Sequence, residues 1–246
     1  MTNPVKTDLR VQPNLESLSR AAAEALVSLA QRAIEQQDRF ALALAGGQTP
    51  RTLYHLLATT YRAVIPWRKV EIFWGDERYV PPEDPRSNYR MAKETLLDHI
   101  PIPADRVHPM LTLLPDIQEA AEAYEETLLS HFTGQWPRFD LVLLGMGPDG
   151  HIASLFPHNI ALEEEARVVT AVRAPEADPP LRLTLTLPAI NHAANVYFLI
   201  AGKEKANAIK QALSGPPKPH LSPASGVRLL DGSLVWWVDE MAGSLL

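Results

Sequence analysis

The sequence contains no cysteine among its 246 residues. Disulfide bonds, thiolate nucleophiles and metal sites built from thiolates are therefore excluded. Long apolar runs are also missing, because no segment approaches the ~20 apolar residues that cross a bilayer. From Met1 to Arg10 no apolar stretch lies between a basic start and a small-residue cleavage site. We therefore expect a cytoplasmic protein without a membrane partner.

Positive charge is scarce as well. Lysine and arginine number 23 against 29 aspartate and glutamate residues, which gives a formal net charge of -6. Such a chain lacks the electrostatic footprint of a nucleic-acid-binding protein, so no nucleic-acid partner is expected. An anionic substrate would need a local cluster of positive side chains. The G-x-S-x-G nucleophile elbow is absent, which leaves a serine-hydrolase mechanism without a starting point.

What is present is an ordinary globular composition, 46% hydrophobic and 21% charged, in a length that suits one domain over residues 1–246. Apolar runs predict strands at 39–44, 70–74, 139–144, 167–173, 181–187, 195–200 and 234–238. Helices are predicted at 14–37, from about Pro50, from Ser87 or Asn88 to about Leu97, at 116–132 and at about 204–213. This alternation indicates an α/β fold, Rossmann-like, with a mostly parallel sheet and helices on both faces.

Three unusual loops directly follow predicted strands. They are residues 45–50 (AGGQTP), 75–78 (GDER) and 145–151 (GMGPDGH). In an open parallel sheet, ligands bind beyond the carboxyl ends of the strands. The three loops should therefore lie along one edge of the sheet and form a binding site there.

The first loop has the composition of a phosphate cradle. Gly46 and Gly47 let the backbone approach an anion closely, and the first N–H groups of the following helix point towards it. Gln48 and Thr49 add side-chain donors. The Gly-Lys-Ser/Thr ending of a nucleotide P-loop is missing. The alternative is a plain strand-to-helix turn.

The second loop carries Asp76, Glu77 and Arg78 immediately after an aromatic-rich strand. Three charges at a strand end are more often a solvated turn. Here residues 79–82 and 87–89, which follow, look like part of the wall of a binding site rather than a random polar loop, and this favours a functional role.

The third loop matches the dinucleotide fingerprint G-x-G-x-x-G at residues 145–150, but Pro157 follows too soon for the crossover helix that this fingerprint needs. His151 is the more informative residue, because a histidine can act as a base near pH 7. Asp149 could orient its ring or interact with substrate. The alternative is a structural histidine. His151 and His158 lack a recognisable metal-ligand spacing, so no metal is expected.

Arg182 and Lys205 are candidate phosphate clamps. Arginine holds a phosphate with two parallel hydrogen bonds, and lysine acts as a point charge. Both residues are also common on ordinary protein surfaces.

On these residues the sequence resembles the 6-phosphogluconolactonase family. The matching segments are 45–50, 74–81 with 87–89, 145–157 and 182–184, and they cover essentially the whole chain in the family's order. The segment 145–157 is the most specific. Gln48 stands where the family is expected to have serine, which puts in question the contact of this side chain with phosphate. The related glucosamine-6-phosphate deaminases have Asp-Glu-Tyr at 76–78 and an acidic Asn-Glu-Pro ending after the histidine, and this chain has neither.

The resemblance implies the fold shared by glucosamine-6-phosphate deaminases and ribose-5-phosphate isomerases. It also implies hydrolysis of 6-phospho-D-glucono-1,5-lactone to 6-phosphogluconate, the second step of the oxidative pentose phosphate pathway, without a cofactor. Lactone hydrolysis needs an activated water and a partner for the oxyanion. We expect His151 to be the general base and Arg78 the oxyanion partner, with Asp76 and Asp149 positioning sugar hydroxyls or the histidine. The residues expected to hold the phosphate are Gly46, Gly47, Gln48, Thr49, Arg182 and Lys205.

Two alternatives remain open. One is an aldose–ketose isomerase or deaminase on the same fold. The other is a non-catalytic sugar-phosphate sensor, which would need a helix-turn-helix and a basic patch, and the sequence offers neither. The expected partner is a small phosphorylated lactone, and the expected state is a monomer or a weak homo-oligomer.

Overall fold

The main sheet has six parallel strands. The computed structural model describes residues 6–246, and residues 1–5, on which part of the N-terminal expectation rests, lie outside the described residues. The strand order is β1-β9-β8-β5-β2-β3, and every neighbouring pair is parallel. The bounds are Lys6–Gln12 for β1, Phe40–Leu44 for β2, Val70–Trp74 for β3, Leu141–Leu144 for β5, Asn195–Ile200 for β8 and Ser233–Asp239 for β9.

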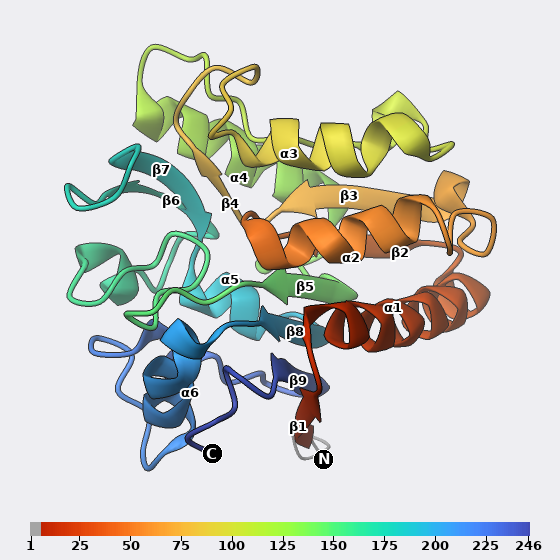
Figure 1. Ribbon diagram of the computed structural model, residues 1–246. Coiled ribbons are helices and arrows are strands. Elements are labelled where there is room, and N and C mark those ends of the chain that lie inside the picture. Colours follow the sequence, from red (N-terminus) through yellow and green to blue (C-terminus); the bar gives the residue numbers. More distant parts are fainter. Residues whose placement is uncertain (1–5) are drawn as a thin grey trace.

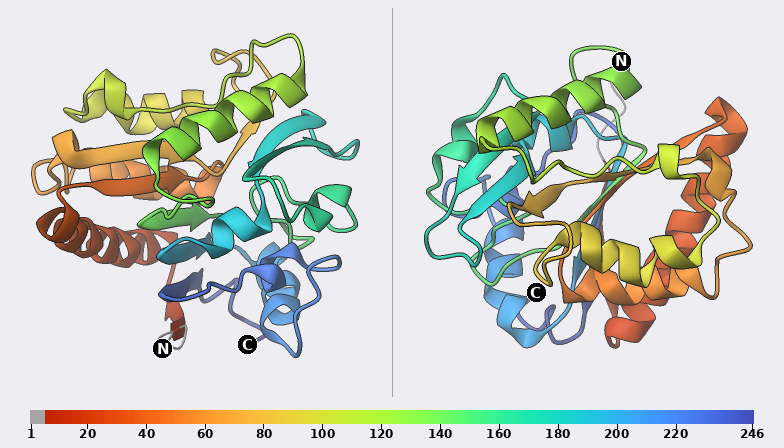
Figure 2. Two further views of the ribbon diagram at one scale, coloured as in Figure 1. Left: turned by 180° about the vertical axis from the view of Figure 1, so that it is seen from behind. Right: turned by 90° about the horizontal axis from the view of Figure 1, so that it is seen from above.

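Helices cover both faces of this sheet. Figure 1 shows α1 (Leu15–Gln37) and α2 (Gln48–Ala58) in front of the strands. The reverse view in Figure 2 shows α4 (Ile117–His131) and α5 (Leu187–Asn191) on the other face. Two further helices are α3 (Asn88–Thr95), which contacts α2 and runs along the β3 edge of the sheet in Figure 1, and α6 (Ala206–Leu213), which follows β8. The predicted fold class is confirmed.

A second, three-stranded antiparallel sheet lies beside the main one, in the order β4-β7-β6. Its strands are Asp76–Arg78, Leu181–Leu185 and Val169–Arg173 respectively. Sequence analysis placed 75–78 in a loop, and this was wrong for residues 76–78. These residues are a strand because their backbone pairs with β7, with Asp76 opposite Thr184 and Arg78 opposite Arg182.

The central strands are fully buried, as parallel strands covered on both faces must be. Every residue of β2 and β5 is buried. Helix α1 begins where the Asn14 side chain accepts a hydrogen bond from Ser17 N, and it ends at Asp38 in the left-handed conformation (φ 61°). Its inward face carries Leu18, Ala22, Leu26 and Ala30 at helical spacing.

Several element boundaries differ from prediction. Strand β1 and helix α5 were not predicted, α2 begins at Gln48 rather than at Pro50, and α3 ends at Thr95. Short 3-10 turns occupy Trp67–Lys69, Leu97–His99, Ala104–Arg106, Ile160–Glu163, Lys203–Lys205 and Pro223–Gly226. Within the described part of the chain, none of the helices combines the length and apolarity that spanning a membrane requires.

Candidate functional site

A cavity of about 600 Å³ lies at the carboxyl ends of the parallel strands. All three of the predicted loops contribute to its wall, together with β7 and the 3-10 turn Lys203–Lys205 that precedes α6. The predicted site residues that line it are Gly46, Gly47, Gln48, Thr49, Asp76, Arg78, His151, Arg182 and Lys205. Asp149 is not among the lining residues and reaches the site through His151.

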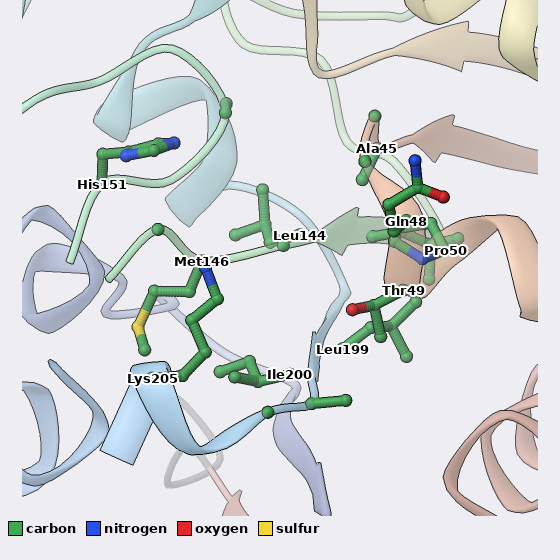
Figure 3. Close-up of a pocket in the computed structure, with 18 of the residues that line it drawn as sticks. Ala45, Gln48, Thr49, Pro50, Leu144, Met146, His151, Leu199, Ile200 and Lys205 are labelled. Atoms are coloured by element: carbon green, nitrogen blue, oxygen red, sulfur yellow. The ribbon is translucent and has the colours of Figure 1, made fainter. Parts of the chain in front are cut away.

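The β2–α2 loop presents bare backbone donors to the cavity. Gly47 is the residue before α2 and has φ 98°, a conformation that favours glycine. The first turn of α2 has no side-chain cap and no acidic residue. Its first N–H groups, with the positive end of the helix dipole, are therefore available to an anion. Figure 3 shows Thr49 and Lys205 from opposite loops on the same cavity.

A buried hydrogen-bond network fixes Asp76 in the cavity wall. Asp76 is only 5% exposed. Asn88 Nδ2 donates to its backbone oxygen (2.9 Å) and its Oδ1 (3.2 Å), and Ser154 Oγ donates to Oδ2 (2.7 Å). Gly46 packs directly on the same amide, since a Cβ there would lie 2.0 Å from Asn88 Oδ1. Three loops thus meet at one carboxylate.

Glu77 has a structural task. It is buried, and its carboxylate accepts hydrogen bonds from the backbone N–H groups of Arg78, Asn88 and Tyr89, each at 2.7 Å. Ser87 Oγ also donates to it, at 3.1 Å. Burial raises the pKa of Glu77 although the backbone hydrogen bonds oppose this. Glu77 therefore ties β4 to the start of α3 and leaves Asp76 and Arg78 as the polar residues of β4 that face the cavity.

Two guanidinium groups share one wall of the cavity. Arg78 and Arg182 are paired across β4 and β7, where opposite residues project to the same side. Arg182 is 6% exposed, and its Nε and Nη2 donate to the carbonyls of Pro179 (3.0 Å) and Asp178 (3.2 Å). Burial, and then the charge of Arg78, lower the pKa of Arg182.

Arg78 is less completely satisfied. Its Nη1 donates to Arg86 O at 2.7 Å, while its buried Nε has no hydrogen-bond partner among residues 6–246. Because a buried unpaired donor is costly, an anionic or carbonyl oxygen in the cavity would relieve that cost. The arginine pair therefore makes this wall suited to a negatively charged ligand.

His151 and Asp149 form a hydrogen-bonded pair at the mouth of the third loop. Nδ1 of His151 lies 2.6 Å from Asp149 Oδ1, and the ring packs against Phe156 with centroids 4.5 Å apart. Gly147 makes this possible, because a Cβ there would lie 2.1 Å from His151 Nδ1. Partial burial raises the pKa of Asp149, but the hydrogen bond with His151 lowers it by a larger amount. The pKa of Asp149 is therefore below its ordinary value.

An ionised Asp149 fixes the tautomer of His151. The carboxylate accepts the Nδ1 proton, so Nε2 carries the lone pair of the neutral ring. Since His151 lines the cavity, this nitrogen can accept a hydrogen bond from a ligand there. No helix opens at Gly150, where the chain forms turns, so the structure confirms the rejection of the dinucleotide fingerprint.

Lys205 belongs to a turn that hydrogen bonds fix to the end of β9. The N–H of Gly202 (φ 104°) donates to both carboxylate oxygens of Asp239 at 3.1 and 3.3 Å. The turn Lys203–Lys205 follows and brings Lys205 to the cavity beside Met146, as Figure 3 shows. Asp239 and the neighbouring Glu204 also line the cavity.

Some functional residues escaped sequence analysis. Asn88 and Ser154 were noted only as parts of motifs, and Asp239 was not noted at all. Each contacts a residue 12, 78 or 37 positions away in the sequence, so no local spacing pattern predicts these contacts.

Relatives in other organisms cover nearly the whole chain. The sequence model described as "Glucosamine-6-phosphate isomerases/6-phosphogluconolactonase" matches residues 13–236. A 6-phosphogluconolactonase from Synechocystis is 43% identical over 218 residues, covering 87% of this chain and 88% of that protein. One from Mycobacterium leprae is 41% identical, covering 91% and 92%.

The chain belongs to the 6-phosphogluconolactonase family. It is an enzyme of that family, and the predicted resemblance is confirmed. The solved structure of the Trypanosoma brucei 6-phosphogluconolactonase superposes with a TM-score of 0.86 at 32% identity, covering 98% of this chain and 99% of that one. A monomeric glucosamine-6-phosphate deaminase, at 24% identity and a TM-score of 0.81, shares the fold of the 6-phosphogluconolactonase family.

Proposed function

We propose that this chain hydrolyses 6-phospho-D-glucono-1,5-lactone to 6-phosphogluconate, the second step of the oxidative pentose phosphate pathway, with His151 as general base. The observation that carries the proposal is the His151–Asp149 pair, whose 2.6 Å hydrogen bond leaves Nε2 basic on a cavity lined by two arginines and a lysine. Relatives named 6-phosphogluconolactonase support the choice of substrate.

The reaction needs one base and one stabiliser of negative charge. Nε2 of His151 takes a proton from water as the oxygen attacks the lactone carbonyl carbon. The carbonyl oxygen becomes an oxyanion, for which the unpaired Nε of Arg78 supplies a donor. When the intermediate collapses, the ring C–O bond breaks and the ring oxygen takes the proton from His151. The new carboxylic acid then ionises and releases one proton.

The phosphate would lie where fixed positive charge is concentrated. The uncapped start of α2 at Gly47, Gln48 and Thr49, the Lys205 ammonium and the Arg182 guanidinium all line the same cavity. A dianionic phosphate pairs with the helix dipole and with both side chains. Asp76, held rigid by Asn88 and Ser154, is then placed to accept hydrogen bonds from sugar hydroxyls.

The proposal extends to the whole chain. Residues from Leu15 to Asp239 line one cavity, so we take the active unit to be one domain, the single domain that the sequence predicts for residues 1–246. The reaction needs no redox or group-transfer step, so no cofactor is invoked. A cytoplasmic enzyme acting on a small phosphorylated lactone fits an acidic chain whose cavity is lined by Arg78, Arg182 and Lys205.

A deaminase on the same fold is the competing activity. Its reaction opens a sugar ring and moves a proton between adjacent carbons, which calls for a second acid–base carboxylate beside the histidine. The cavity carboxylates are Asp76, Glu204 and Asp239, and residues 163–165 are not in its wall. Asp76 and Asp239 are engaged in hydrogen bonds to neighbouring segments, and Asp149 is paired with Nδ1 of His151. A deaminase reaction would therefore have to use Glu204 as its second carboxylate.

Parallel assays of the purified chain test the proposal. Given 6-phosphogluconolactone near neutral pH, it should release one proton per turnover faster than spontaneous hydrolysis. Given glucosamine 6-phosphate, it should release no ammonia. Ammonia release at a rate comparable to lactone hydrolysis would overturn the proposal.

His151→Ala tests the general base. Turnover should fall roughly 10²–10⁴-fold with the fold intact. His55→Ala, which removes an exposed histidine of α2 outside the cavity wall, is the matched control and should be fully active. Near-normal turnover in His151→Ala would remove His151 from the mechanism.

A further inference from the structure

A cluster of metal-ligating side chains outside the cavity lies at the amino end of β3. Glu71 is the second residue of that strand, His108 follows the 3-10 turn Ala104–Arg106, and His131 is the last residue of α4. One ligand atom from each of these three residues lies within 4.8 Å of the others. Glu71 is five residues before Asp76, roughly 16 Å along an extended chain, so this cluster is separate from the cavity.

Two of the three side chains are oriented by outer hydrogen bonds. Arg106 Nη1 donates to Glu71 Oε1, which leaves Oε2 facing His108 Nε2 at 2.8 Å. Nδ1 of His131 lies 2.8 Å from the backbone oxygen of Thr127, so it carries the proton and its Nε2 carries a lone pair. Metal-binding histidines and carboxylates usually have such outer partners.

Aromatic packing holds the two imidazoles together. The ring of His108 stacks on Phe73 at 4.7 Å, and His131 meets the same ring edge-on at 5.6 Å. The centroids of the two imidazoles are 4.1 Å apart. The residues are half-buried, and only small rotations would bring the ligand atoms to a common ion.

The local charges select the kind of ion. The carboxyl end of α4, at His131, carries the negative end of a 15-residue helix dipole and favours a cation. Arg106 binds Glu71, and Arg39 Nη1 donates to the backbone oxygen of His131 at 2.8 Å. Glu71 is the one carboxylate of the cluster and is already paired with Arg106, whereas Ca²⁺ and Mg²⁺ need several oxygen ligands. Imidazole ligands instead suit first-row transition metals.

We propose that Glu71, His108 and His131 form a Zn²⁺ site with water as the fourth ligand. Two histidines and one carboxylate around a tetrahedral ion are an established zinc ligand set. The ion would join the end of α4 to the start of β3 and to the 104–108 segment. Its effect is on stability, because the reacting cavity is at the other end of β3.

Zinc titration of the metal-free chain tests the proposal. Calorimetry with ZnCl₂ should give one tight equivalent per chain, and a Zn²⁺ concentration about 100-fold above the Kd should raise Tm by roughly 5–10 °C. Both effects should be lost in His131→Gln and in His108→Gln. Lactone hydrolysis should be the same with and without the ion. Two variants are used so that a misfolded one, recognised by circular dichroism, leaves the other to decide.

His99→Gln is the matched control, because His99 is a surface histidine outside the cluster. It should retain the tight equivalent and the Tm shift. His151→Gln separates this site from the cavity and should also retain both. The absence of tight binding in the unaltered chain, or equal binding in a folded His131→Gln or His108→Gln variant, would overturn the proposal.

Discussion

Replacing Ser154 with alanine removes the hydroxyl that donates to Asp76 Oδ2 across 2.7 Å. Ser154 is 0% exposed and Asp76 is 5% exposed, so water cannot replace the lost donor without opening the wall. A hydrogen bond to a charged group contributes about 1.5–3 kcal/mol, and a buried acceptor left short of donors costs a similar amount. We therefore expect the free energy of unfolding to fall by about 1.5–3 kcal/mol, and Tm by roughly 3–12 °C for a chain of this size.

Ser19→Ala is the matched control. Ser19 is also 0% exposed, but its hydroxyl has no hydrogen-bond partner among residues 6–246, and it lies inside helix α1. Removing an unsatisfied buried hydroxyl and gaining helix propensity should leave stability unchanged or raise it by up to about 1 kcal/mol. The two substitutions are chemically identical and differ in the bond to Asp76.

The measurements are denaturant unfolding and steady-state kinetics on both variants. If Asp76 orients the sugar, kcat/KM of Ser154→Ala should fall measurably, by up to about 100-fold, the limit set by the same lost bond. Ser19→Ala should keep full activity. Equal stability of the two variants would refute the assigned strength of the Ser154–Asp76 bond, and unchanged kinetics with lowered stability would make Asp76 purely structural.

The remaining predictions concern charge and metal. Arg182→Ala and Lys205→Ala should each raise KM roughly ten- to a hundred-fold and reduce discrimination between phosphorylated and unphosphorylated lactone; unchanged KM with lowered kcat would place them at the reacting carbonyl instead. Partial burial raises the pKa of Asp149, but the hydrogen bond with His151 lowers it by more, so the pKa in the folded protein lies below its ordinary value. The stabilisation from this bond is therefore present above about pH 4, the unfolded pKa, and is lost as pH falls through the folded pKa. The stability difference between the unaltered chain and Asp149→Asn should therefore shrink on acidification below about pH 4, and a pH-independent difference would contradict this. Dialysis against EDTA should leave turnover unchanged, because the candidate metal ligands found within residues 6–246 lie away from the cavity; activity lost on dialysis and restored by one metal would disprove it.

Buried parallel strands were the most predictable part of the fold. The apolar runs that became β2, β5 and β8 are continuous because helices cover both faces. Strand β1 was not predicted, since it is an edge strand that alternates charged residues with Leu9 and Val11, which are 41% and 47% exposed. Its strand character comes from pairing with β9, which no local pattern encodes.

The positions of the site loops could be predicted from the strand order, but which of their residues face the cavity could not. Asp76 and Glu77 are adjacent and chemically alike, yet one lines the cavity and the other caps α3. Alternation along β4 sends neighbours to opposite faces, and that alternation becomes visible only once 76–78 is known to pair with β7. Asn88 and Ser154 likewise acquire their roles through contacts distant in sequence.

The contact between Gly46 and Asn88 has a consequence for how this enzyme can change over evolution. A methyl group at residue 46 would overlap the amide of Asn88, and the displaced amide would release Asp76. A substitution at residue 46 would thus disturb the part of the cavity wall formed by Asp76 without touching it directly. The cost of either change depends on the other, so their effects on fitness should be non-additive. A larger residue at 46 would therefore need a compensating change at 88, and engineering of the 45–50 loop alone would meet the same constraint.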